Sequence, residues 1–125
     1  KMDTSIKILV VDDFATMRRI LKNILKQLDF TNIFEADDGI TAYEQIKEGR
    51  FDLIISDWNM PKMSGLELLK KVRSMNECKD IPFLMVTAEA QKANVIEAVK
   101  AGVSNYVVKP FTAEAIADKM KKILG

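Results

Sequence analysis

Short apolar runs alternate with segments of helical periodicity along the whole chain. Each run is rich in branched residues, which is typical of strands buried in a parallel sheet. The runs that predict strands are residues 6–11, 32–36, 52–56, 82–87 and 105–108. Between and after them, apolar residues recur every three or four positions, as on the buried face of an amphipathic helix. The predicted helices have their first apolar or helix-forming residue at Met17, Thr41, Leu66, Val95 and Ala113.

Strands that alternate with helices through short connections predict an α/β fold. We find no internal repeat, low-complexity tract or interdomain linker. We therefore predict one domain over residues 1–125, with a single doubly wound five-stranded parallel sheet flanked by five helices. Gly102 is expected to end the fourth helix. The residues expected on the inner face of the last helix are Ala113, Ile116, Ala117, Met120, Ile123 and Leu124.

Polar side chains stand where the predicted strands end. Right-handed crossovers place the carboxyl ends of the strands on one edge of the sheet. That edge should collect Asp12, Asp13, Asp57, Thr87 and Lys109. Asp57 ends the apolar run of the central strand, and Pro61 and Gly65 then enforce a loop. A carboxylate in this position lies where open α/β sheets bind their ligands.

The predicted cluster of three acids needs compensating charge, because neighbouring carboxylates repel and resist ionisation in a low dielectric. Lys109 supplies one positive charge, which cannot neutralise three acids. A divalent cation with oxygen ligands is the natural addition, and Mg²⁺ prefers one or two carboxylates together with waters and a phosphoryl oxygen. Thr87 and Lys109 suit the oxygens of a phosphoryl group. Asp57 is then either a metal ligand or a carboxylate nucleophile.

Composition narrows the chemistry further. The 125 residues are 48% hydrophobic and 30% charged, and a net charge of +1 gives no general case for binding nucleic acid or a membrane. The absence of histidine excludes Ser-His-Asp and Cys-His catalysis and most zinc sites. The single Cys78 cannot form an internal disulfide, which fits a reducing compartment. Without a membrane-length apolar run or a signal-peptide pattern, we expect a cytoplasmic protein.

The motifs at the strand ends, taken together, resemble those of a response-regulator receiver domain over essentially the whole chain. They are the acidic pair Asp12-Asp13, then Asp57 with Pro61 and Gly65 behind it, Thr87-Ala88 and Lys109-Pro110. The runs VVDDFATMRRI, SDWNMPKMSG, MVTAEA and YVVKPFTA are similar to the stand-alone chemotaxis receiver of flagellated bacteria. The resemblance implies a flavodoxin-like sheet of strand order 2-1-3-4-5, for which the chemotaxis receiver is itself a standard example.

The resemblance also implies a role for each residue at this edge. Asp57 would accept a phosphoryl group from the phosphohistidine of a chemotaxis histidine kinase. The ligands of Mg²⁺ would be Asp13, Asp57 and the backbone carbonyl of Asn59, with Asp12 acting through water. Thr87 and Lys109 would bind phosphoryl oxygens, and the Lys109-Pro110 bond would be cis. A protein of this kind is a phosphoacceptor switch that catalyses only its own phosphorylation and dephosphorylation.

The output side of the switch is expected in the last third of the chain. The resemblance implies that Thr87 and Tyr106 move together and that a surface of the fourth helix, fifth strand and last helix binds the flagellar motor switch protein. The residues expected on that surface are Lys92, Val95, Val99, Tyr106, Lys119 and Lys122. Residues 91–125 hold six lysines against three acids, a basic balance that suits an acidic amphipathic peptide. The alternative is that this basic surface is an ordinary solvated helix face. We also expect a phosphatase among the partners, and we expect the protein to be a monomer.

Three departures from the family pattern lie outside the proposed chemistry, and the first is Ala15, where chemotaxis receivers often have Ser. Ser64 stands where the family usually has Asp or Asn, and it could still cap the third helix. Asp29 stands where glycine commonly ends the first helix, so a left-handed backbone there would cost roughly 1 kcal/mol or less.

Three other classes of protein share parts of the pattern. A Mg²⁺-dependent phosphohydrolase of the haloacid dehalogenase type also forms an aspartyl phosphate, but it needs D-x-D after the first strand, and Phe14 stands two positions after Asp12. A flavin-binding electron carrier needs a Ser/Thr/Gly-rich phosphate loop where this chain has the acidic run DDFATMRR. A receiver fragment of a transcriptional regulator is the third alternative, which the chemotaxis-like runs disfavour.

Overall fold

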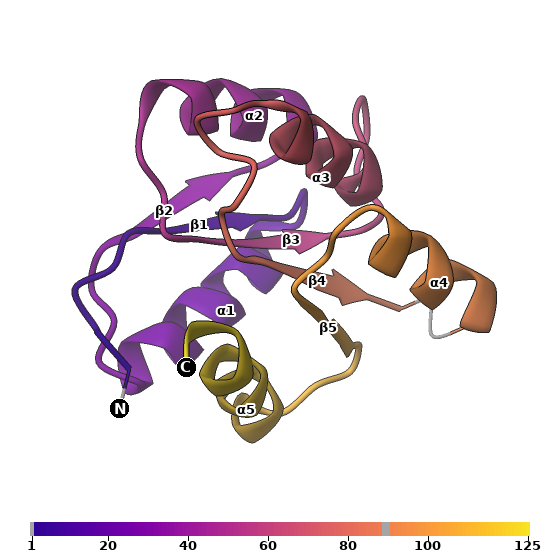
Figure 1. The fold of residues 1–125 in the computed structure, drawn as a ribbon. Coiled ribbons are helices and arrows are strands. Elements are labelled where there is room, and N and C mark those ends of the chain that lie inside the picture. The colour runs from indigo at the N-terminus through magenta and orange to yellow at the C-terminus, as the bar shows by residue number, and fades with distance from the viewer. Residues whose placement is uncertain (1, 89–90) are drawn as a thin grey trace.

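The computed structural model describes residues 2–88 and 91–125, which form a five-stranded sheet between two layers of helices (Figure 1). In chain order the elements are β1 (Ile8–Val11), α1 (Ala15–Gln27), β2 (Ile33–Ala36), α2 (Gly39–Glu48), β3 (Leu53–Asp57), α3 (Gly65–Ser74), β4 (Phe83–Thr87), α4 (Lys92–Lys100), β5 (Asn105–Val108) and α5 (Ala113–Leu124). All neighbouring strands are parallel, in the order β2-β1-β3-β4-β5. The predicted fold class and the strand order implied by the resemblance are both confirmed.

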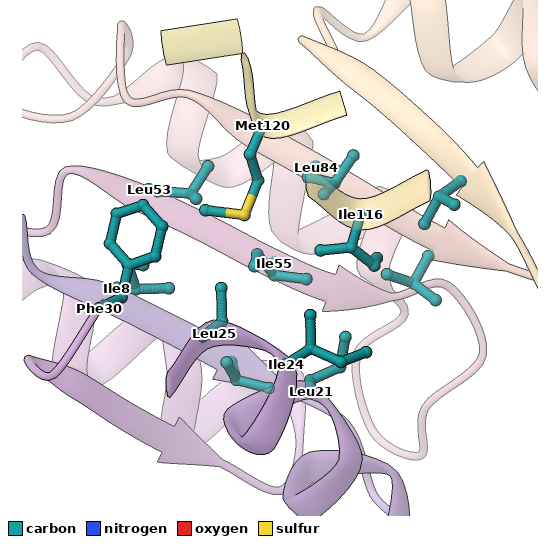
Figure 2. Close-up of a cluster of buried hydrophobic side chains, with 13 residues drawn as sticks. Ile8, Leu21, Ile24, Leu25, Phe30, Leu53, Ile55, Leu84, Ile116 and Met120 are labelled. Carbon is teal, nitrogen blue, oxygen red and sulfur yellow. The ribbon is translucent and has the colours of Figure 1, made fainter. Parts of the chain in front are cut away.

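The central strands are buried on both faces, as their continuous apolar runs predict. Every residue of β1, β3 and β4 is buried, whereas the edge strand β2 exposes two of its four residues. Because α1 and α5 cover one face of the sheet and α2, α3 and α4 the other, the core has two halves (Figure 1). Figure 2 shows the half under α1 and α5, where Leu21, Leu25, Ile116 and Met120 meet side chains of the strands.

The ends of all five strands agree with the sequence prediction to within two residues, and the differences have simple causes. Asp57 is itself the last residue of β3, one position later than predicted. The sequence predicts Ala113 on the inner face of the last helix, but Ala113 is exposed, because it stands in the first turn directly after the Thr112 cap. The apolar stripe on α5 is therefore shorter than its sequence predicts, and Ile116 and Met120 are its buried members.

Several backbone expectations are also met. The Lys109–Pro110 bond is cis, Gly102 has a left-handed φ of +94°, and Asp29 has a left-handed φ of 74°. Ser64 caps α3 in a reciprocal capping box with Glu67. Within residues 2–88 and 91–125, no helix is long and apolar enough to cross a membrane.

Candidate functional site

The carboxyl edge of the sheet brings four of the predicted site residues into direct contact range. Asp57 ends β3, Asp12 follows β1, and both are almost completely buried, whereas the neighbouring Asp13 is exposed. Carboxylate oxygens of the three acids lie within 4.8 Å of one another. The Lys109 Nζ lies 3.0 Å from Asp57 Oδ1 and 3.7 Å from Asp12 Oδ2. The predicted acidic cluster with one facing ammonium is therefore present.

Thr87 reaches the same edge through the pairing of β4 with its neighbours. It ends β4 and is buried, and its main-chain oxygen accepts a hydrogen bond from the Lys109 N–H at 2.8 Å. Asp57 pairs with Val86, the residue before Thr87, and the Trp58 N–H donates to the Val86 oxygen at 3.0 Å. Parallel pairing thus holds Thr87 beside both Asp57 and Lys109.

Burial dominates the protonation of the two inner acids. It raises the pKa of Asp12, and the hydrogen bond from the Phe14 N–H opposes this rise, while the charge of Asp57 adds to it. Burial likewise raises the pKa of Asp57, and the hydrogen bond and charge of Lys109 oppose that rise. The ionised pocket is therefore costly, and Lys109 offsets only part of the cost.

The donor set fits a hard divalent cation. Asp12 Oδ1 accepts a hydrogen bond from the Phe14 N–H at 2.9 Å, whereas Asp12 Oδ2 is buried and has no hydrogen-bond partner among the described residues. A buried carboxylate oxygen without a donor is costly unless a cation or an ordered water satisfies it. Three clustered carboxylates with one such oxygen match the oxygen-rich coordination of Mg²⁺. The acidic group is consistent with a divalent metal site.

The backbone around Asp57 is held by an unusually close approach of α3. The Gly65 N–H donates to the Trp58 oxygen at 2.7 Å, and a Cβ on Gly65 would overlap the Asp57 main-chain oxygen. The Ser56 hydroxyl also donates to that oxygen at 2.9 Å. Only a residue without a side chain lets the helix start this near the strand end, so Gly65 does more than mark a loop.

The remaining predicted residues lie around or beyond this pocket. Asn59 is exposed, two residues beyond Asp57. Tyr106 is half-buried in β5, pairs with Met85 in register, and has the Lys119 Nζ 5.5 Å from its ring centroid. The other residues expected on the output surface lie on α4 and α5: Lys92, Val95 and Val99, then Lys119 and Lys122. Val99 is 60% exposed.

Sequence reasoning missed one side chain at the site. The sequence pattern identifies Arg18 only as a polar position between the apolar residues of the first helix. In the structure its Nη1 donates to the Asp12 main-chain oxygen at 2.7 Å, and its Nε donates to Glu35 Oε1 at 2.9 Å. The acceptor on Asp12 is a backbone atom, which leaves no signal in the sequence.

Comparison with known families agrees with this geometry. The family described as "Response regulator receiver domain" matches residues 8–121. This chain belongs to that family. The chemotaxis protein CheY-3 of Vibrio cholerae serotype O1 is 53% identical over 122 residues, which are 98% of this chain and 94% of the relative. The chemotaxis protein CheY of Pseudomonas aeruginosa is 56% identical over 117 residues, 94% of each chain.

Solved structures share the receiver fold. The chemotaxis response regulator CheY4 of Vibrio cholerae superposes with a TM-score of 0.89 at 36% identity, covering 97% of this chain and 100% of that one. The receiver domain of a sensor histidine kinase from Pseudomonas aeruginosa, solved with a magnesium ion coordinated in its active site cleft, gives 0.87 at 23% identity, over 97% and 98%. The prediction of a chemotaxis-type receiver is confirmed, and this protein is a phosphoacceptor of two-component signalling rather than a conventional enzyme.

Proposed function

We propose that this protein is a cytoplasmic chemotaxis response regulator that is phosphorylated on Asp57 by a histidine kinase and then binds the flagellar motor switch. The observation that carries the proposal is the environment of Asp57. Its carboxylate ends a buried central strand, faces the Lys109 ammonium at 3.0 Å and lies in one cluster with Asp12 and Asp13. A structural ion pair alone would not need two further acids beside it.

In the transfer step one Asp57 carboxylate oxygen attacks the phosphorus of the kinase phosphohistidine. The new O–P bond forms as the N–P bond breaks, and the imidazole leaves. Asp57 must be ionised to attack. The nearby Lys109 favours the ionised form, against the burial that raises the pKa of Asp57. After transfer, Lys109 and Thr87 bind the phosphoryl oxygens, since the Lys109 Nζ lies 3.0 Å from Asp57 Oδ1 and Thr87 ends the strand that pairs with β3.

The residues proposed to hold Mg²⁺ are Asp13, Asp57 and the backbone carbonyl of Asn59, with Asp12 contributing through water. A bound divalent cation would neutralise the clustered carboxylates and the charge of the incoming phosphoryl group. The protein contributes the fixed position of the acids. Burial of Asp12 and Asp57 keeps bulk water from competing for the same oxygens.

The output step depends on the region next to Thr87. Phosphorylation adds negative charge and acceptor oxygens at one place, and a two-state element must respond to them. We assign that response to Thr87 and Tyr106, and partner binding to the surface formed by α4, β5 and α5. Its exposed apolar side chains, Ile96 and Val99, lie among lysines, which suits an acidic amphipathic peptide of the motor switch protein. The protein would act as a monomeric single domain, with a phosphatase as a further partner and without nucleic acid or membrane.

Two measurements test this function. Transfer of labelled phosphoryl from a phosphorylated chemotaxis kinase should label wild type but not Asp57→Asn, and a chelator should abolish it. Affinity for the N-terminal peptide of a motor switch protein should rise when wild type carries an aspartyl phosphate mimic. Lys109→Ala should still be labelled and yet lose that rise. Acid-stable labelling of Asp57→Asn, or equal peptide affinity in both states, would contradict the proposal, and turnover of an added phosphomonoester would favour a phosphohydrolase.

A further inference from the structure

The main chain between Asp12 and Asp13 is held by a side chain that the proposed chemistry does not use. Arg18 lies in α1 and reaches back to the Asp12 main-chain oxygen, where its Nη1 donates at 2.7 Å. Its Nε donates to Glu35 Oε1 at 2.9 Å. Since Glu35 belongs to β2, the guanidinium connects the end of β1 to the neighbouring edge strand.

Almost every polar atom of Asp12 is fixed within the chain. Its N–H donates to the Ala36 oxygen at 3.2 Å, and its Oδ1 accepts from the Phe14 N–H at 2.9 Å. Arg18 occupies its main-chain oxygen. The atom without a hydrogen bond among the described residues is Oδ2, which lies within the acidic cluster and 3.7 Å from the Lys109 Nζ. Three hydrogen bonds thus direct the fourth polar atom of Asp12 into the pocket.

The same contact controls Asp13. The Asp12 carbonyl and the Asp13 nitrogen belong to one planar peptide unit, so fixing the oxygen fixes the plane from which Asp13 departs. The Asp13 side chain is exposed, and in the described parts of the chain no residue donates a hydrogen bond to its carboxylate. Its direction therefore depends on its backbone more than on side-chain contacts.

The ion pair between Arg18 and Glu35 adds little to stability. The side chains of Arg18 and Glu35 are 18% and 36% exposed, and ion pairs this close to solvent contribute little to folding. A guanidinium can donate from separate nitrogens to two fixed acceptors. Arg18 can therefore hold its two acceptors in a fixed geometry, even though its charge adds little to stability.

We propose that Arg18 is a positioning residue for the Mg²⁺ site, with Glu35 orienting its guanidinium. The inference rests on the proposed function, because it assigns Arg18 to the metal site of that function. Arg18 does not touch the ion or the phosphoryl group. It holds the peptide unit that presents Asp12 Oδ2 and the Asp13 carboxylate.

A purely electrostatic role and a positioning role of Arg18 predict changes of opposite sign in Mg²⁺ affinity. Removing a cation near an acidic site lowers the repulsion felt by Mg²⁺, so loss of the Arg18 charge alone would tighten Mg²⁺ binding. Loss of positioning would weaken it, because disturbing the residues that orient metal ligands typically costs about 10-fold or more in metal affinity. The two roles therefore predict opposite changes.

Lys22 offers a matched control in the same ion-pair group. Its Nζ lies 2.9 Å from Glu35 Oε2, the same distance at which Arg18 Nε approaches Oε1. Within the described residues, the Lys22 side chain donates a hydrogen bond to Glu35 and none to Asp12. Lys22→Gln and Arg18→Gln each remove one positively charged partner of Glu35. Arg18→Gln also breaks the hydrogen bond to the Asp12 main-chain oxygen, which Lys22→Gln leaves in place.

The experiment is a Mg²⁺ titration followed by Trp58 emission, with urea unfolding of each metal-free variant alongside. We expect Arg18→Gln to weaken Mg²⁺ binding about 10-fold while Lys22→Gln stays within about twofold of wild type. Arg18→Lys keeps the charge, and with it the repulsion of Mg²⁺, without the two-point contact, so it should also bind Mg²⁺ more weakly than wild type. If Arg18→Gln does not fold, Arg18→Lys decides the question by the same comparison with wild type.

The outcomes separate this inference from the proposed function. Wild type that shows no saturable Mg²⁺ response, or Asp57→Asn that responds as wild type does, contradicts the metal site itself. A wild-type response that the Arg18 variants share or exceed overturns only the role of Arg18. An equal loss of affinity in Lys22→Gln also overturns it, because the effect would then follow the ion-pair group and not the bond to Asp12.

Discussion

The units β3–α3 and β4–α4 have similar strands and helices of similar length, but their helices are buried to very different extents. Each has a fully buried strand of five residues that ends on a polar side chain, Asp57 or Thr87, and each continues into a helix of nine or ten residues. The helix α3 buries five of its residues, whereas α4 buries Ala98 alone. The apolar side chains of Ile96 and Val99 on α4 face solvent instead.

The starts of the two helices differ in the same sense. α3 begins with a reciprocal capping box and with the Gly65 N–H bonded to the Trp58 oxygen. The N-cap residue of α4 is Gln91, whose side chain makes no capping hydrogen bond. Segments with few buried apolar contacts open at lower free energy than the rest of a fold. The proposed phosphoacceptor thus stands on the firmly held unit, and the proposed output surface on the loosely held one.

The largest expected difference between α3 and α4 is the stability lost when one apolar side chain of each helix is truncated to alanine. Leu69 on α3 is fully buried, so Leu69→Ala should lower the free energy of unfolding by about 3 kcal/mol. Val99 on α4 is 60% exposed, and Val99→Ala should change it by about 0.5 kcal/mol or less. Urea unfolding of both variants measures the difference. Similar losses in the two would mean that α4 is packed as firmly as α3.

The close approach at Gly65 gives the next effect. On helix propensity alone, Gly65→Ala would stabilise α3 by about 1 kcal/mol. The new Cβ would overlap the Asp57 main-chain oxygen, so we expect a net loss of about 2 kcal/mol and slower phosphorylation. Gly49→Ala is the control, because the closest contact of its Cβ would be the flexible end of Lys7, at 2.9 Å. A stabilised Gly65→Ala variant with normal phosphorylation would show that α3 can move away from the strand.

Sequence predicted the edge of the sheet well for a physical reason. Buried runs such as Leu53–Ile55 identify central strands, and the strands of a parallel sheet all end on the same edge because they run in the same direction. The convergence of Asp12, Asp57 and Lys109 follows from those two facts alone. The resemblance then supplied the strand order and the cis bond, which periodicity cannot provide.

The sequence was less informative about how firmly each part is held. The spacing of Val95, Ile96 and Val99 correctly predicts a helix, but periodicity does not reveal what covers its apolar side chains, and little covers them here. The sequence pattern marks Gly65 only as part of a loop, because its contact with Asp57 is made between backbones. Arg18 was missed for a related reason, since it bonds a main-chain oxygen and a strand residue 17 positions away.

The firm packing around Asp57 carries an electrostatic cost that pH should reveal. Burial raises the pKa of Asp12, so the folded protein binds this proton more tightly than the unfolded chain does. The resulting stability is fully present below the unfolded pKa, about 3.9, and is lost as the pH rises through the raised pKa. Without metal at pH 7, Asp12→Asn should therefore be about 1 kcal/mol more stable than wild type.

The difference between Asp12→Asn and wild type should shrink toward pH 3, where Asp12 is protonated in both the folded and the unfolded wild type. Unfolding curves at several pH values measure it. The side-chain amide oxygen that Asp12→Asn introduces can still accept the hydrogen bond from the Phe14 N–H, so the comparison isolates the charge. A gain that is the same at pH 3 and pH 7, or a loss at pH 7, would show that burial of this charge is not the cost.

The smallest expected effect tests whether the missing N-cap hydrogen bond contributes to the low local stability that we expect for α4. Gln91 has the extended backbone of an N-cap residue, with φ −67° and ψ 143°. The Asn94 N–H already donates to the Gln91 main-chain oxygen at 3.0 Å, and a serine hydroxyl at position 91 could share that donor. Gln91→Ser should stabilise α4 by about 0.5 kcal/mol, near the lower limit for such caps. Exchange of the Asn94 amide hydrogen should slow about twofold. As the reverse control, Ser64→Ala removes the existing cap of α3 and should lower the free energy of unfolding by about 1 kcal/mol. Unchanged exchange at Asn94 would mean that sparse burial, and not the missing cap, sets the stability of α4.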